Sequence, residues 1–221
     1  MTSNGNDITG ARGTLYRSLL EPFQFPSTDL NEQFMSGAWG QRLIANAEIL
    51  KYDLPLTDVP MLESSQDKYQ VEFISLFEVG MGGAPCPLHS GHYSKDRMRT
   101  LEEVVRFYGF FEYSPDRSPD RFPDHITFEL EFIAHLADLQ GQAANGQGDA
   151  LSPLRAQRDF VTRHLTSWLP QLTANVVQRG QIRFFSQVVT VLNACVAGDQ
   201  LYLDTRVGEM NLETSGEYQH G

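Results

Sequence analysis

Apolar side chains recur at every third or fourth position along most of this sequence, and glycine or proline ends each such segment. The stretch with Tyr69, Phe73, Leu76 and Phe77 is typical, because these spacings place side chains on one face of an α-helix. No segment alternates β-branched and polar residues between hairpin turns, and no repeat period is visible. The pattern predicts an all-α protein, folded as a single irregular bundle of about seven to ten helices.

Residues that break or cap a helix set the ends of the expected helices. Prolines separate the first two, Ser152 followed by Pro153 starts another, Pro170 interrupts that helix, and Gly198 stops the last one. The predicted helical segments are residues 7–20, 29–52, 64–77, 97–111, 124–140, 152–169, 172–178 and 181–197.

Glycine and proline also mark the connections between these helices. Residues 79–94 form a long Gly/Pro loop, the connection at 114–123 is polar, and residues 141–149 lack large apolar side chains. We expect a flexible N-terminus at 1–8, a single all-helical domain at 9–203 and a flexible C-terminal tail at 204–221.

The composition limits the class of protein and its partners. A hydrophobic fraction of 41% with 11% aromatic residues is typical of a folded globular chain. The first residues lack the charged start and apolar run of a secretory signal, and no stretch is apolar enough to span a membrane, so we expect a cytoplasmic protein. The formal net charge of −11 disfavours nucleic acid and anionic membranes and favours a basic partner.

Two polar residues interrupt the wide apolar arc of the expected helix 124–140. On a helical wheel His125 and Glu129 fall inside that arc, four residues apart, whereas His135 lies on the opposite polar side. They form either a recognition point for a cationic ligand, with Asp124 at the helix start adding charge, or a structural pair bonded to each other or to a neighbouring loop. Both interpretations stay open at this point.

Signals for catalysis are weak in this sequence. Cys86, His89 and His92 have a C-x-x-H-x-x-H spacing in the Gly/Pro loop, which would suit zinc or iron if a fourth ligand such as Asp96 joined them. The glycines of that loop lack the lysine of a phosphate-binding loop, and no G-x-S-x-G nucleophile motif is present. We expect a protein that is not an enzyme, has no cofactor and acts by binding another protein.

Two segments carry a resemblance to a known family. They are YQVEFISLFEVGMGGAPCPLHSGHY at 69–93 and FPDHITFELEFIAH at 122–135, joined by W-L-P at 168–170. In this order they resemble the TorD/DmsD/NarJ family of redox-enzyme maturation chaperones. The resemblance implies an all-helical chaperone that binds the apo catalytic subunit of a molybdenum oxidoreductase, often at its twin-arginine leader, and holds back export while the cofactor is inserted.

The motif L-F-E-V-G followed by G-G-x-P-C-P-L is similar to a subgroup of that family. This subgroup serves type II enzymes of the dimethyl sulfoxide reductase family, such as dimethylsulfide and ethylbenzene dehydrogenases and selenate and chlorate reductases. The resemblance places the family's leader-binding P-D-H on Pro123, Asp124 and His125, and its loop tyrosine on Tyr93. Leu76, Phe77 and Glu78 match the family's helix end, and Phe122 stands where the family usually has Glu or Gln.

These residues lead to a specific hypothesis for partner binding. A leader segment would lie in a groove lined by Phe77, Tyr93 and Phe128, with Asp124 and Glu129 meeting its positive charges. The alternatives are a small metal-dependent enzyme or metal-binding protein that uses Cys86, His89 and His92, and a structural subunit held by a permanent partner.

Overall fold

Helix α6 (Ile126–Ala144) is covered by other helices along most of its length. A computed structural model describes residues 3–55, 57–78, 83–115, 122–144, 146 and 148–217. Ile126, Leu130, Phe132, Ile133 and Leu136 are all 0% exposed. A helix that is apolar on nearly every side is stable only inside a protein, so the bundle is built around α6.

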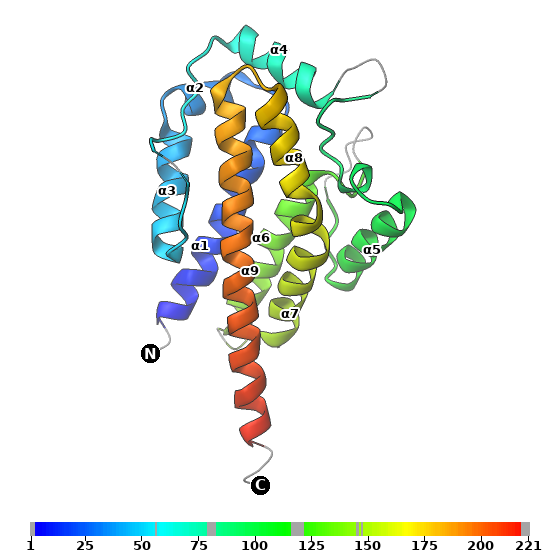
Figure 1. Cartoon of the computed structure of the whole chain (residues 1–221). Helices are drawn as coiled ribbons and strands as arrows, with labels where there is room; N and C mark the ends of the chain where they lie inside the picture. Colours follow the sequence, from blue (N-terminus) through cyan, green and yellow to red (C-terminus); the bar gives the residue numbers. More distant parts are fainter. Residues whose placement is uncertain are drawn as a thin grey trace.

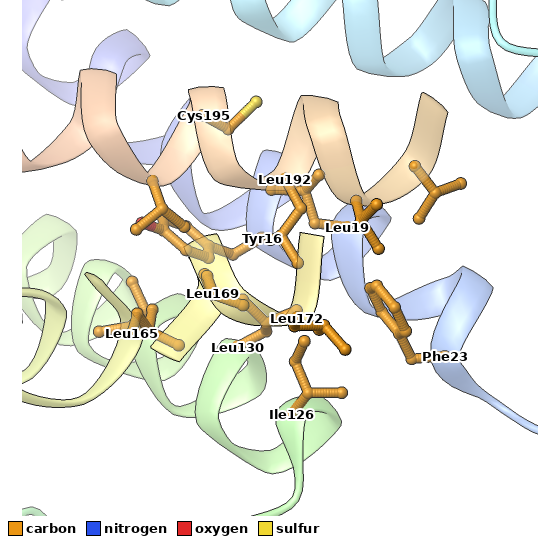
Figure 2. Packing of buried hydrophobic residues seen from close by; sticks show 14 of the residues in the cluster. Tyr16, Leu19, Phe23, Ile126, Leu130, Leu165, Leu169, Leu172, Leu192 and Cys195 are labelled. Atoms are coloured by element: carbon orange, nitrogen blue, oxygen red, sulfur yellow. The ribbon is translucent and has the colours of Figure 1, made fainter. Parts of the chain in front are cut away.

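Helix α6 packs against α1 over much of its length and also against α7, while α9 packs against α7 and α8 (Figure 1). Side chains from α1, α6, α8 and α9 meet in the core, where Tyr16, Leu130, Leu169 and Leu192 pack together (Figure 2). The described residues contain no strand, and the expected all-α bundle is confirmed. The other helices are α1 (Ser3–Leu20), α2 (Thr28–Met35), α3 (Ala38–Leu50), α4 (Gln66–Phe77), α5 (Arg97–Phe110), α7 (Leu151–Phe160), α8 (Thr166–Arg179) and α9 (Arg183–Glu217).

The single helix expected at 29–52 is wrong, because Gly37 divides it into α2 and α3. Gly37 takes a φ of 72°, a left-handed conformation that L side chains rarely adopt. A few residues on, the backbone of Gly40 approaches Pro60 so closely that a Cβ there would lie 2.4 Å from the Pro60 carbonyl oxygen. The chain therefore turns at one glycine and packs tightly at the next.

The expected interruption at Pro170 is also wrong, since this proline lies inside α8. Residues Val161–Leu165 between α7 and α8 are π-helical, and the Thr166 N–H donates to the Val161 carbonyl. A π-helical turn just before the proline lets the helix accommodate its missing N–H, so the backbone stays helical from Leu151 to Arg179. The start of α7 is capped by the Asp149 carboxylate, which accepts from the Leu151 and Ser152 amides, rather than by the Ser152 hydroxyl.

Three helices are longer than the sequence pattern predicted. Helix α1 already begins at Ser3, inside the expected flexible N-terminus, and α6 extends to Ala144. Helix α9 continues through Gly198 to Glu217, well into the expected tail, and its C-terminal part projects beyond the other helices (Figure 1). Parts of the predicted connections lie outside the described residues, at 79–82, 116–121, 145 and 147, as do the last tail residues, 218–221.

A buried ion pair explains why α9 does not end at Gly198. The next residue, Asp199, is 0% exposed and accepts from Arg12 of α1 through Nε at 2.6 Å and Nη2 at 2.9 Å. The hydroxyls of Tyr16 and Tyr52 donate to the same carboxylate, and Gly198 lies against the Tyr52 ring. These contacts offset the roughly 1 kcal/mol that a glycine costs inside a helix.

No helix among the described residues is long and apolar enough to cross a membrane.

Replacing Asp199 by Ala should lower the free energy of unfolding by about 3–5 kcal/mol, because Arg12 would remain as a buried charge without its counter-ion. Urea unfolding followed by circular dichroism measures this change. The control is Glu209→Ala, which breaks an exposed pair with Arg206 and should cost less than about 1 kcal/mol. Equal losses in the two variants would contradict the assignment.

Candidate functional site: the junction between the loop and helix α6

The described part of the Gly/Pro loop is joined to the chain just before α6 by backbone hydrogen bonds. The Ser90 N–H donates to the Asp124 carbonyl at 3.0 Å, and the Ile126 N–H donates to the Leu88 carbonyl at 2.8 Å. His89 and His125 lie opposite each other in this short antiparallel bridge. We call the two paired segments, residues 88–93 and 122–129, the junction.

Asp124 joins the two sides of the junction through its side chain. Its carboxylate is 1% exposed and accepts from the Gly91 N–H at 3.0 Å and from His89 Nδ1 at 3.2 Å. Burial disfavours the ionised form, but the hydrogen bonds from His89 and Gly91 outweigh it and hold the pKa of Asp124 below its ordinary value. A Cβ at Gly91 would lie 2.8 Å from Asp124 Oδ2, so this close contact requires glycine.

Asp124, at the start of the expected helix, does not cap it, because its carboxylate faces the loop. His125 caps the helix instead. Its Nδ1 accepts from the Thr127 N–H at 3.3 Å and lies 2.7 Å from the Thr127 hydroxyl. His125 is 6% exposed, and its ring lies against those of His89 and Phe128.

Glu129 is buried one turn further along α6. It is 0% exposed, and one of its carboxyl oxygens accepts from Trp168 Nε1 of α8 at 3.2 Å. Burial raises the pKa of Glu129 to about 8, the charge of Asp124 adds to the rise, and the hydrogen bond from Trp168 opposes it. Glu129 is therefore mostly protonated at neutral pH. Two interpretations of His125 and Glu129 were open, a recognition point for a cationic ligand and a structural pair. This geometry fits a structural pair bonded to neighbouring elements.

The aromatic residues expected to line one groove lie in two places. The Tyr93 ring packs on Trp168 with centroids 5.2 Å apart, while its hydroxyl donates to the Pro87 carbonyl at 3.0 Å. Phe128 packs on His125, so Tyr93 and Phe128 both belong to the junction. Phe77 instead packs in an aromatic cluster with Phe23, Phe73 and Phe185.

The accessible surface of the junction includes Phe122 and His89, which the sequence pattern did not single out as partner-binding residues. Phe122 is 54% exposed, and the guanidinium of Arg97 lies over its ring at 5.7 Å. The side chain of His89 is 21% exposed, and its ring contacts those of Phe122 and His92. Pro123 is half-buried, and its carbonyl accepts from the Tyr108 hydroxyl at 3.0 Å. Sequence spacing holds no signal for this arrangement, since it depends on pairing across the loop.

The C-x-x-H-x-x-H spacing brings the rings of His89 and His92 into contact but does not assemble three metal ligands. Cys86 is buried, and its N–H donates to the Leu76 carbonyl at the end of α4, whereas His89 is bonded to Asp124. Burial raises the pKa of the Cys86 thiol, which disfavours the thiolate that binds metal. Within the ranges that the structure covers, no group of three suitable side chains could hold a metal ion.

Residues 50–174 match the nitrate reductase delta subunit family. The chain belongs to this family. The resemblance to the TorD/DmsD/NarJ chaperones is thereby confirmed, and α4, the junction and the start of α8 all lie within the matched part.

Two relatives and one solved structure extend this comparison. The chain is 35% identical to the chlorate reductase assembly chaperone protein of Ideonella dechloratans, over 74% of this chain and 76% of that one. It is 27% identical to the perchlorate reductase assembly chaperone protein of Dechloromonas aromatica, over 94% and 93%. A redox enzyme maturation protein from Archaeoglobus fulgidus has the same fold, with a TM-score of 0.51 at 20% identity over 82% of this chain and 91% of that one.

The burial of Glu129 predicts a specific pH dependence. A carboxyl group whose pKa is raised in the folded state stabilises the fold while it is protonated, and that stabilisation is lost as the pH rises from about 4.5 to about 8. Glu129→Gln should remove this loss, so the variant should gain about 3 kcal/mol over the wild type between pH 4.5 and pH 7.

Urea unfolding of both proteins across that pH range measures the difference. Glu131→Gln, at an exposed position on the same helix, is the control and should follow the wild type more closely. A difference between wild type and Glu129→Gln that does not change with pH would show that Glu129 is ionised in the folded protein.

Proposed function

We propose that this protein is a system-specific assembly chaperone for a molybdenum oxidoreductase. It binds the apo catalytic subunit, together with its twin-arginine leader, while the cofactor is inserted and before export. The observation that carries this proposal is the 35% identity, over about three quarters of both chains, to a protein named as a chlorate reductase assembly chaperone. A task that precedes export places the chaperone in the cytoplasm.

The proposal treats the chain as a binding protein without catalytic activity of its own. The relatives reported above are named as assembly chaperones, and none of their names refers to a reaction that the chaperone catalyses. The net charge of −11 supports a partner with a basic segment, since opposite charges speed association and help to select the partner. We propose that the domain that binds the partner spans residues 9–203.

The junction is the proposed site of partner binding, with Asp124, His125 and Glu129 holding it together. Their burial supports an indirect part for these three: they fix the loop against α6, so that Phe122 and His89 face outward. The other residues of this proposed site are Pro123, Tyr93, Phe128 and Phe77. In this arrangement the partner binds the exposed surface, and the buried side chains hold that surface in position.

Calorimetric titration of the purified chain with the leader peptide of its cognate catalytic subunit tests the proposed function. The wild type should bind the leader saturably and a scrambled peptide not at all. If it binds neither the leader nor the apo catalytic subunit, the chaperone proposal fails.

The double variant Asp124→Ala with His125→Ala tests the junction. It should weaken leader binding by about tenfold or more, corresponding to about 1.4 kcal/mol, because the loop is no longer held against α6. Helix content measured by circular dichroism should stay unchanged. The matched control is Asp138→Ala with His135→Ala, the same residue types further along α6. Wild-type affinity in the junction variant would remove the junction from the binding surface.

A further inference from the structure

A groove of about 600 Å³ lies between α4, the segment before it and the start of α9. Three large apolar side chains on its walls are open to solvent: Val59 is 39% exposed, Met61 40% and Val71 66%. The volume falls within the roughly 300–1,000 Å³ of ligand-binding clefts. Met61 adds an adaptable surface, because methionine is flexible and polarisable. The groove therefore offers apolar surface to a peptide side chain or a short apolar segment.

The lining of this groove includes two carboxylates that are in no ion pair among the described residues. Glu63 and Asp67 are exposed, and neither forms an ion pair with any residue that the structure describes. Glu72 is only 6% exposed, and its Oε1 accepts from the backbone amides of Gln181 and Ile182. Glu72 therefore adds a third carboxylate to the groove lining, and both hydrogen bonds described for it use Oε1.

The charges of the groove leave an excess of negative charge. Its lining holds four carboxylates and two cationic side chains, Lys68 and Arg183. Arg183 is already paired with Asp58 on the opposite wall at 2.9 Å. Apolar surface beside unpaired carboxylates is complementary to a peptide that combines adjacent cationic side chains with apolar ones.

We propose that this groove binds the arginine pair and the first apolar residues of the twin-arginine leader. This inference rests on the proposed function, and it places the leader's charges away from the junction. Asp124 is 1% exposed and already bonded, and Glu129 is buried and mostly protonated, whereas Glu63 and Asp67 are exposed. A guanidinium binds a carboxylate in a two-pronged fashion, so two adjacent arginines match two rim carboxylates.

Helix α4 lies between the groove and the loop of the junction. Helix α4 crosses the end of the bundle opposite to both chain termini, and the start of α9 lies below it (Figure 1). Helix α4 ends at Phe77, and its end is tied to the loop by the Cys86–Leu76 backbone hydrogen bond. The same helix thus connects the groove to the loop that forms one side of the junction.

The test is a titration of the full chain with the cognate leader peptide in the variant Glu63→Gln with Asp67→Asn. Its affinity should fall about tenfold, and the loss should be largest at low salt, since exposed charge pairs are screened by added salt. The matched control is Glu48→Gln with Asp29→Asn, which removes the same net charge at exposed positions and again includes an aspartate in the first turn of a helix. This control should bind like the wild type.

A leader peptide with both arginines changed to glutamine gives a second measurement. It should bind the wild type weakly and should lose no further affinity in the groove variant. Equal affinity of wild type and groove variant for the native leader would overturn the groove assignment. So would an equal loss in the control variant, since it would show a general effect of net charge.

The remaining outcomes separate this inference from the proposed function. If the wild type binds no leader but binds the apo catalytic subunit without its leader, and the groove variant weakens that binding, another basic segment occupies the groove and the leader assignment is overturned. If the wild type binds neither probe, the proposed function itself fails, and this inference fails with it.

Discussion

The burial of α6 on nearly every side is the constraint on which the other contacts depend. A helix whose side chains are mostly excluded from water needs neighbours along its whole length, and α1, α7, α8 and α9 supply them. Every polar group carried inward by such a helix must find a partner or lose its charge. This requirement determines how the start of α6 is built.

The junction shows three solutions to that requirement within six residues. Asp124 stays ionised because a loop amide and a histidine bond to it, and His125 uses its ring nitrogen to cap the helix. Glu129 has one indole donor and no cation nearby, and its pKa rises to about 8. The loop, α6 and α8 are joined by these bonds, so disturbing one of them affects the position of the other two.

The sequence was informative where a local pattern decides the structure. The apolar periodicity located α4 and α5 almost to the residue, because side-chain spacing and an N-cap act within a few positions. It failed where a distant contact decides: Gly198 continues a helix because Asp199 binds Arg12, far away in the sequence. Pro170 stays helical because of the π-helical turn before it, a feature of backbone geometry that side-chain spacing does not report.

The same division applies to the candidate site. A helical wheel located His125 and Glu129, because polar residues in an apolar arc are unusual wherever they occur. It could not show that they face protein rather than a ligand, since His89 and Trp168, which lie against them, come from other segments. The sequence indicated His89 only as a possible metal ligand and Phe122 only as a departure from the family motif. Their contact at the surface of the junction depends on the backbone pairing.

The family's P-D-H motif could serve in two ways, by attracting a basic leader or by shaping the loop, and burial separates these two roles. Asp124 and His125 of the P-D-H motif are buried, and the Asp124 carboxylate already accepts hydrogen bonds from His89 and Gly91. A carboxylate that is satisfied in the free protein gains little from a new cation, because the bonds it would exchange are equally good. An exposed carboxylate beside apolar surface gains more, since a peptide brings both the charge and the apolar side chains that exclude water around it. In the proposed arrangement, the groove at α4 therefore attracts the basic leader, and the motif fixes the shape of the loop.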